Sequence, residues 1–381
     1  MTRWPLVPLS EAAQIVNGGT PKTGVREYWD GGVPWMTPAE MGRRWSPFAG
    51  ETRRTLSTAG LSNCSARLIP AQSIILSTRA PIGHLVINTV PMAFNQGCRG
   101  ITPRQGFDTK YLFYFLQANR KLLDDLGVGT TFRELSARAL AAVRIPAAPL
   151  AEQRRIVAIL DEAFTGIVTA IANAEKNQAN ARELLRAATM SLLQGENWLE
   201  RPLGSFCAIY QPETISKKQM SEAGQYAVFG ANGKIGRYDR FNHEEEQLLV
   251  TCRGATCGSI NMSEPFSWIT GNAMVIRPKD GELRIGLLRR IFQNGFDFDR
   301  VITGAAQPQI TRQSLAPAKI RYPVDTGEQA RLESVMDNLE RQAAALQRCH
   351  QRKLSLLAEL KQSILHRAFN GDLTQAEVLA A

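Results

Sequence analysis

The sequence predicts an α+β protein with two mixed α/β globules separated by a pair of long antiparallel helices, an intramolecular coiled coil with pseudo-two-fold symmetry. Three observations predict this fold. The chain is duplicated, each copy ends in a long segment with a heptad pattern of apolar residues, and the rest of each copy mixes short β-like runs with turn residues.

The duplication is visible in landmarks that recur 176 residues apart, such as Glu152-Gln153 and Glu328-Gln329. The apolar runs that precede Arg79 and Arg253 are a second matched pair. Leu9 lies 70 residues before Arg79, whereas Leu203 lies 50 residues before Arg253. The first copy therefore carries about 20 extra residues early on, and we expect the two copies to differ most there.

Each copy is expected to contain one globule followed by one long helix. Turn-forming runs such as Gly18-Gly19-Thr20-Pro21 and Gly230-Ala231-Asn232-Gly233 separate short β-like runs, and one short helix is expected per globule, at 110–117 and 285–293. The predicted division is a first globule at 1–149, a first long helix at 150–195, a second globule at 196–326, a second long helix at 327–371 and a tail at 372–381.

The two long segments predict helices because apolar or small residues recur every three or four positions. In the first segment this seam is Leu160, Ala163, Ile167, Ile171, Ala174, Gln178, Ala181, Leu185, Ala188 and Leu192. In the second it is Leu332, Met336, Leu339, Ala343, Leu346, His350, Lys353, Leu357, Leu360 and Ile364. A helix with one apolar seam needs a partner, and the other copy supplies one. An intermolecular coiled coil that makes a dimer is the alternative.

The charge balance favours a polyanionic partner. The net charge is +10, and residues 1–150 hold 17 basic and 9 acidic side chains, so most of the excess lies in the first globule. A merely basic cytosolic protein is the other reading. The six cysteines are scattered without a CxxC pair, which disfavours a zinc site, and no signal peptide or run of 18 apolar residues is present. We expect a cytoplasmic protein.

Several motifs, in this order and duplicated, resemble the specificity subunit of type I restriction–modification systems over nearly the whole chain. They are Asn17-Gly18-Gly19-Thr20-Pro21, the stretch from Ile145-Pro146 to Ile156, Phe229–Gly236, and Ser363–Leu373 with its Ala368-Phe369 pair. Two places depart from the family pattern. Val324-Asp325-Thr326 replaces a Pro-Leu step, and the first helix ends in Leu192-Leu193 without an Ala-Phe pair, which makes the two docking surfaces for the methyltransferase unequal.

The resemblance implies a non-catalytic subunit whose two target-recognition domains each read one half of a bipartite double-stranded DNA target. The helices would set the spacer and dock two modification (methyltransferase) subunits, which restriction subunits join. S-adenosylmethionine, ATP and Mg²⁺ would belong to those partners, with no cofactor, metal or catalytic residue in this chain. The residues agree, since no phosphate-binding GxxxxGK[ST] loop and no Gly-x-Ser-x-Gly elbow is present.

Polar and basic residues in turn-rich stretches are the candidate DNA contacts, since hydrogen-bonding side chains read base edges while Lys and Arg contact phosphates. In the first globule they are Thr20, Lys22, Arg43, Arg44, Arg79, Gln96, Arg99, Thr130, Thr131 and Arg133. In the second they are Lys217, Lys218, Asn232, Lys234, Arg237, Arg253, Gln307 and Gln309. Arg79 and Arg253 are favoured because both follow an apolar strand at equivalent positions; the alternative is that they hydrogen-bond turn carbonyls.

Two other classes of protein remain open. A stand-alone DNA-binding regulator would bind specifically without partners, and a coiled-coil adaptor would show no salt-dependent DNA affinity. The doubled plan of globule and helix with a basic first globule favours the specificity subunit over both.

Overall fold

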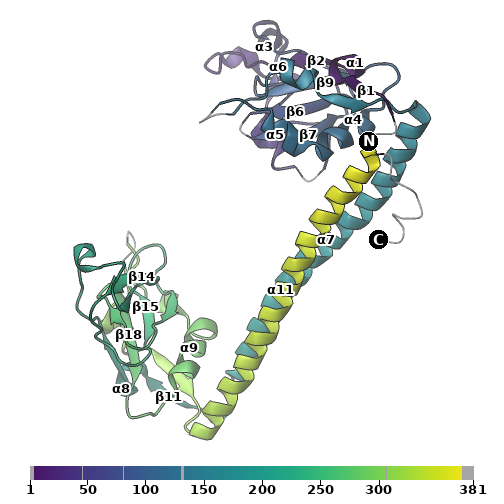
Figure 1. Ribbon diagram of the computed structural model, residues 1–381. Helices are drawn as coiled ribbons and strands as arrows, with labels where there is room; N and C mark the ends of the chain where they lie inside the picture. Colours follow the sequence, from purple (N-terminus) through teal and green to yellow (C-terminus); the bar gives the residue numbers. More distant parts are fainter. Residues whose placement is uncertain (1–3, 45, 80, 130–132, 305–306, 371–381) are drawn as a thin grey trace. The chain divides into compact units, whose positions relative to one another are not determined.

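The computed structural model describes residues 4–44, 46–79, 81–129, 133–304 and 307–370 (Figure 1). The chain forms two compact units. The first unit comprises residues 1–174 and 352–381, and the second comprises 175–351. Each unit therefore contains one globule and a segment of each long helix, α7 (Leu150–Leu192) and α11 (Thr326–Asn370).

The first globule is built on a five-stranded sheet in the order β2-β9-β6-β7-β4 and a three-stranded sheet in the order β5-β3-β8. The strands are β1 (Leu6–Pro8), β2 (Ala13–Asn17), β3 (Trp29–Met36), β4 (Phe48–Ala49), β5 (Thr55–Leu56), β6 (Ile74–Thr78), β7 (Ile82–Asn88), β8 (Ala93–Phe94), β9 (Cys98–Pro103) and β10 (Arg144–Pro146). The apolar strand β6 is buried along its whole length between β7 and β9, as its Ile-Ile-Leu sequence requires.

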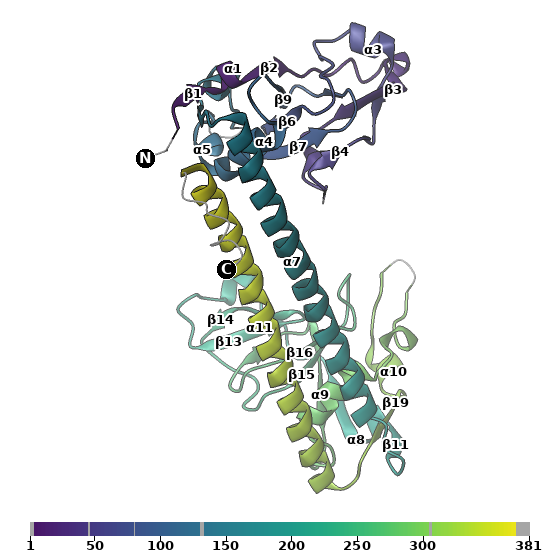
Figure 2. The same cartoon turned by 90° about the vertical axis from the view of Figure 1, so that its right-hand side faces the viewer.

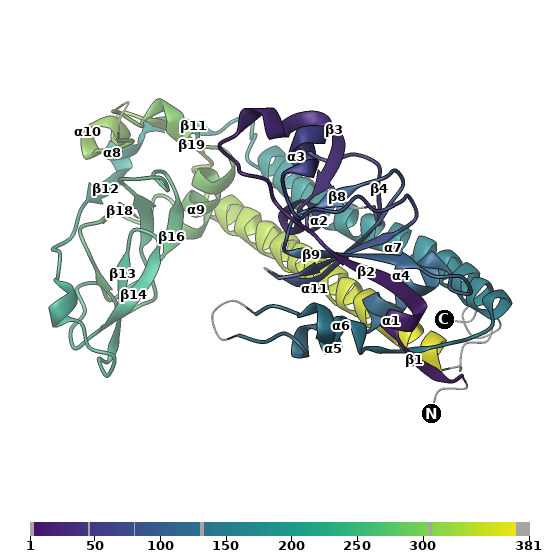
Figure 3. The ribbon, with the colours of Figure 1, turned by 90° about the horizontal axis from the view of Figure 1, so that it is seen from above.

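Short helices surround these sheets. They are α1 (Leu9–Ala12), η1 (Arg26–Tyr28), α2 (Pro38–Met41), α3 (Thr58–Ser62), α4 (Thr109–Ala118), α5 (Arg120–Asp125) and α6 (Ala137–Ala141). Figure 3 shows α6 beside α1, and α6 also contacts β2. Helix α4 confirms the helix predicted at 110–117. The elements η1, α2, β4 and α3 all lie between Leu9 and β6, in the part where the first copy is longer.

The second globule repeats this topology with fewer elements. Its strands are β11 (Leu199–Pro202), β12 (Cys207–Tyr210), β13 (Tyr226–Gly230), β14 (Gly233–Tyr238), β15 (Leu248–Thr251), β16 (Ile260–Met262), β17 (Trp268–Ile269), β18 (Ala273–Pro278) and β19 (Lys319–Tyr322). The order β12-β18-β15-β16 matches β2-β9-β6-β7, and the sheet β14-β13-β17 matches β5-β3-β8, including the parallel pair. This correspondence confirms the internal duplication.

The helices of the second globule are α8 (Leu203–Phe206), η2 (Lys217–Gln219), α9 (Ile285–Asn294), η3 (Phe298–Arg300) and α10 (Arg312–Leu315). Helix α9 confirms the helix predicted at 285–293 and packs its Leu287, Leu288 and Phe292 into the core of this unit.

In each unit the segments of α7 and α11 lie side by side and run antiparallel (Figure 2). In the first unit Leu160 of α7 shares a core with Leu365 and Phe369 of α11, and the Phe369 ring lies 5.1 Å from Tyr111 of α4. In the second unit Leu192 packs against the core that contains Leu332 of α11. The long helices thus pair within one chain, as predicted.

The burial pattern confirms the seam predicted for α7 and corrects the one predicted for α11. Each seam residue of α7 is buried or half-buried. In α11, Leu346 is 50% exposed and Lys353 is also exposed, whereas Gln347 and Leu354 are half-buried. The predicted seam is therefore one residue off at these two positions, whereas His350, Leu357, Leu360 and Ile364 are half-buried or buried as predicted. The prediction fixed on the apolar Leu346, but helix geometry places the polar Gln347 on the inner face.

Helix α7 contains an 18-residue window with a mean hydropathy of 1.5, and 33% of that window is buried. By length and composition alone such a segment could cross a membrane. Its Ile156, Leu160, Phe164 and Ile167 side chains are instead buried in the core of the first unit, so α7 is a core helix.

A buried glutamine attaches each globule to its long helix. Gln153 in α7 accepts from the Asp108 N–H (2.8 Å), and its side-chain amide donates to the carbonyls of Gly106 (2.9 Å) and Ala148 (2.8 Å). Gln329 in α11 accepts from the Arg284 N–H (2.9 Å) and donates to two carbonyls, at 2.9 and 2.8 Å. Asp108 and Arg284 are the residues that precede α4 and α9, so both copies join globule to helix in the same way.

Candidate nucleic-acid interface

Four of the residues predicted for the first globule meet where β6 ends and β9 begins. Arg79 directly follows β6, and Arg99 is the second residue of β9. The Thr20 hydroxyl donates to the side-chain oxygen of Gln96, and Arg99 Nη1 donates to the carbonyls of Gln96 (3.1 Å) and Cys98 (3.0 Å). Thr20, Arg79, Gln96 and Arg99 form what we call the first strand-end cluster.

A loop brings an acidic residue to this cluster. Glu134 lies 3.8 Å from Arg79 Nη1 through Oε2 and 3.6 Å from Arg99 Nη2 through Oε1. Val128 and Glu134 exchange two backbone hydrogen bonds of 3.0 Å, and the Leu135 N–H donates to the Thr78 carbonyl (2.9 Å). These bonds hold the base of the 128–134 loop against the end of β6.

The first strand-end cluster and its loop hold two cationic side chains, Arg79 and Arg99, and one carboxylate, Glu134. Cys98, the first residue of β9, is buried, and burial raises the pKa of its thiol to about 12, although the Arg99 and Arg79 charges oppose the rise. The thiol is therefore neutral near pH 7 and adds no negative charge. Two guanidiniums against one carboxylate leave a net positive charge at this strand end.

The remaining residues predicted for the first globule lie apart from the cluster or have structural partners. Lys22 and Arg43 are exposed. Arg44 pairs with Glu40 (3.5 Å), and Arg133 pairs with Asp124 (3.3 Å) and also donates to backbone carbonyls at the base of its loop. Thr130 and Thr131 lie outside the described residues.

The second globule has an equivalent cluster at the end of β15. Arg253 forms a β-bridge with Gln309, as Arg79 does with Glu134. Thr303 and Gln309 exchange two backbone hydrogen bonds (2.8 and 2.9 Å), and the Ile310 N–H donates to the Cys252 carbonyl (2.9 Å). Asn232 joins this region because its Oδ1 accepts from the Thr251 hydroxyl (3.0 Å).

Gln307 is exposed in the same 303–309 loop. Asn232, Arg253, Gln307 and Gln309 thus form what we call the second strand-end cluster. Both arginines lie beside the bonded base of their loop, and their contact with DNA stays a prediction.

The other residues predicted for the second globule are elsewhere. Lys217 and Lys218 are exposed on η2, and Lys234 on β14 lies 3.9 Å from Glu264. Arg237 on β14 donates to the carbonyls of Gly224 and Gln225, which lie just before β13, so its side chain has structural partners.

Sequence reasoning missed Glu134, Gln153 and Gln329. A signal for Glu134 was available, because it lies 175 residues before Gln309, which was predicted. Gln153 and Gln329 were quoted as landmarks of the repeat, but a buried amide that bonds three backbone groups has no signature in one sequence.

Comparisons with known proteins agree on one family. The family described as "Type I restriction modification DNA specificity domain" matches residues 1–181 and 195–354. The specificity subunit of the type I restriction enzyme MjaIX of Methanocaldococcus jannaschii is 30% identical over 51% of this chain, an alignment that covers 43% of that relative. The EcoprrI specificity subunit of Escherichia coli is 25% identical, with 72% of this chain and 73% of the relative covered.

Two solved structures share the fold. A chain from a study of the "complex assembly and conformational transition of the type I R-M system" has a TM-score of 0.80 at 20% identity, with 97% of this chain and 98% of that chain covered. The HsdS subunit from Thermoanaerobacter tengcongensis has a TM-score of 0.60 at 20% identity, with 97% of each chain covered. These likenesses confirm the predicted fold class of mixed α/β globules with long helices.

The two family matches fall one on each copy of the repeat and together span most of the chain. They confirm the resemblance that the duplicated motifs indicated, and the family is one of DNA recognition, which is a non-catalytic role. This chain therefore belongs to the type I restriction–modification DNA specificity family.

Proposed function

We propose that this chain is the DNA sequence-specificity subunit of a type I restriction–modification complex, in which each globule reads one half of a bipartite double-stranded target. The observation that carries the proposal is the repeated strand-end cluster. Arg79 with the 128–134 loop and Arg253 with the 303–309 loop occupy the same place in two globules of the same topology. Two equivalent readers in one chain suit a target in two parts.

The division of labour follows the domain limits predicted from the sequence. Residues 1–149 and 196–326 would be the target-recognition domains, 150–195 and 327–371 the spacer helices, and 372–381 a tail. Helices of 43 and 45 residues are roughly 65 Å long at ~1.5 Å per residue, longer than the ~34 Å that separates readers one turn apart on DNA. A stiff helix pair would fix the spacer better than a flexible linker.

The partners in this proposal are two modification (methyltransferase) subunits docked on the helices, and restriction subunits that join them. S-adenosylmethionine, ATP and Mg²⁺ would be bound by those partners. The complex would work in the cytoplasm, where it meets DNA. The side chains of the two strand-end clusters would contact base edges, and exposed Lys22, Arg43, Lys217 and Lys218 would contact phosphates and set the register.

The test is selection of bound DNA from a randomised duplex library, with the full chain alone and together with a methyltransferase subunit encoded beside it. We expect two conserved half-sites with a fixed spacer, and affinity that falls as salt rises. A single uninterrupted site bound by the chain alone would favour a stand-alone regulator. No salt-dependent DNA affinity in either form would indicate a coiled-coil adaptor and overturn the proposal.

The role of the helices is tested separately. Lengthening α7 by about one turn, together with α11 so that the seams stay matched, should change the selected spacer and keep both half-sites. A variant with the same number of residues inserted after Asn370 is the control. An unchanged spacer in the lengthened variant would contradict the ruler role.

A further inference from the structure

The two strand-end clusters differ in charge at one equivalent position. The backbone bonds that join Val128 to Glu134 and Leu135 to Thr78 recur as bonds that join Thr303 to Gln309 and Ile310 to Cys252. Glu134 and Gln309 are therefore equivalent, and they carry a carboxylate and a neutral amide on the same frame.

The second arginine of the first cluster also has no counterpart. Ser77 pairs with Cys98 across β6 and β9, and Thr251 pairs with Ala273 across β15 and β18. The next residue is Arg99 in the first globule and Met274 in the second. Met274 is 1% exposed. The first globule thus holds Arg, Glu and Arg together, whereas the second has one Arg beside an amide.

The three charged residues of the first cluster form a chain from a fixed end to an accessible end. Arg99 is anchored by two carbonyls, and its side chain is 11% exposed. Glu134 faces Arg99 with one carboxylate oxygen and Arg79 with the other, and the Arg79 side chain is 38% exposed. Gly97 packs against the Arg79 stem, because an added Cβ there would lie 3.2 Å from it.

A carboxylate on one side of a guanidinium restricts its rotation and leaves other N–H groups free to donate. Arg presents its donors in a planar fork that matches the O6 and N7 acceptors of guanine, the commonest base-specific contact of this side chain. Lys carries the same charge without the fork. On the basis of the proposed function, we propose that Glu134 is a positioning residue: it holds Arg79 in the orientation that reads a guanine in the first half of the target. Arg99 anchors Glu134.

The experiment repeats the library selection on the full chain in its complex and compares the wild type with R79K, E134Q, the double variant and E11Q. Glu11 is exposed on α1, so E11Q makes the same charge change on the same globule. E134Q introduces the residue that the second globule already has at this position, so the fold should tolerate it, and a thermal melt of each variant checks this.

The wild type should select guanine at one position of one half-site. R79K should lower the preference for guanine over the other bases at that position by about 5- to 150-fold. E134Q should lower it at that same position by about 2- to 5-fold, as expected for a half-exposed ion pair. The double variant should lose no more than R79K, because Glu134 acts only through Arg79. E11Q should match the wild type.

Three results would overturn the inference while the proposed function survives. R79K could leave every position unchanged, E134Q could act at another position or weaken all sequences alike, or the losses of the two variants could add. If the wild type itself selects no bipartite sequence, the proposed function fails, and the inference fails with it before any variant is compared.

Discussion

The two junctions between globule and long helix share one frame and differ in chemistry. In the first unit Tyr114 of α4 donates to Asp161 of α7 (2.6 Å), and Lys110 lies 2.6 Å from the same carboxylate. In the second unit the residues 176 positions later are Arg290 and Asp337, which form an ion pair. The same contact between helices is made by a neutral donor in one copy and by a cation in the other.

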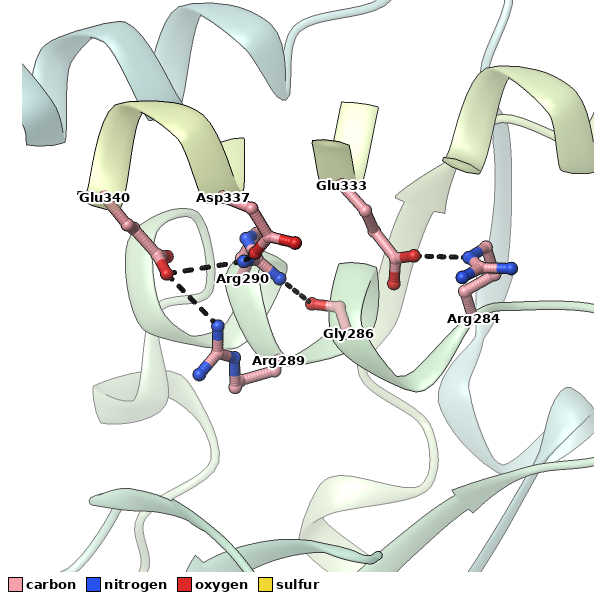
Figure 4. A network of polar contacts seen from close by, with 7 residues as sticks. All are labelled: Arg284, Gly286, Arg289, Arg290, Glu333, Asp337 and Glu340. Carbon is pink, nitrogen blue, oxygen red and sulfur yellow. Dashed lines mark hydrogen bonds and ion pairs between the residues drawn. The ribbon is translucent and has the colours of Figure 1, made fainter. Parts of the chain in front are cut away.

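The side chains around these two helix contacts differ in the same way, aromatic in the first unit and charged in the second. In the first unit the Tyr114 ring packs edge-on against Phe164 at 5.4 Å, and burial raises the pKa of the Tyr114 hydroxyl, so it stays a neutral donor. At the position of Phe164 the second unit has Glu340, which lies 3.3 Å from both Arg289 and Arg290, and Arg284 pairs with Glu333 (Figure 4). In each unit the buried glutamine holds the start of the short helix against the long helix, and the other side chains of the contact are aromatic in one unit and ionic in the other.

The two junctions should differ most in the unfolding free energy that is lost when the acidic residues of each junction are replaced by alanine. Arg290 has a side chain only 3% exposed, so D337A with E340A leaves a buried cation without its carboxylate partners, with the Gly286 carbonyl still bonded to it, at a loss of about 3–5 kcal/mol of unfolding free energy. D161A leaves a neutral hydroxyl and a half-exposed lysine, at a loss of about 1–2 kcal/mol. Chemical denaturation followed by one fluorescent probe in each unit measures both.

The control for this prediction is the triple variant R290M with D337A and E340A. It removes the buried cation together with the acids and should recover most of the loss. Equal losses for the D161A variant and the double variant, or no recovery in the triple variant, would show that the two junctions do not differ in the way described.

The shared glutamines should behave alike. Q153A and Q329A each leave one N–H and two carbonyls without their side-chain partner, so each should destabilise its own unit by about 2–4 kcal/mol. Q178A, at a half-buried seam position of α7, is the matched control and should have a smaller effect. A large loss in one unit only would mean that the glutamine is not the common anchor.

A smaller difference is expected from salt. The pairs of Arg284 with Glu333 and of Arg289 with Glu340 are partly exposed, so raising NaCl from 0.05 to 1 M should weaken each by less than about 1 kcal/mol. Helix α4 has one such pair, Lys110 with Asp161, and otherwise packs Tyr111 and Phe115 against Phe369 of α11. Amide hydrogen exchange should therefore speed up more in α9 than in α4. Equal acceleration in the two helices would contradict the ionic description of the second junction.

The duplication made most of the fold predictable, because a pattern that occurs twice is constrained twice. The seam of α7 follows from periodicity, and the helices at 110–117 and 285–293 follow from a cluster of apolar residues and its counterpart in the repeat. The seam of α11 failed at Leu346 because hydrophobicity and helix geometry disagree there, and geometry decides. Ala368-Phe369 and Leu192-Leu193 are equivalent in the repeat, and both pairs pack against a globule, although their sequences differ.

The candidate interface was less predictable. Residues next to a strand end, such as Arg79 and Arg253, could be identified because the strand is recognisable in sequence. Arg44 and Arg237 could not be separated from them, because their structural partners Glu40 and Gly224 are visible only after folding. Glu134 was missed because a carboxylate is not an expected DNA ligand, and only its position between two arginines gives it a role.

The claim that each globule reads one half of the target is tested most directly by exchanging residues 1–145 for the first globule of another family member. The methylated or selected sequence of the resulting complex is then mapped. We predict that one half-site changes to that of the donor, while the other half-site and the spacer are retained. A change in both half-sites, or in neither, would contradict the account.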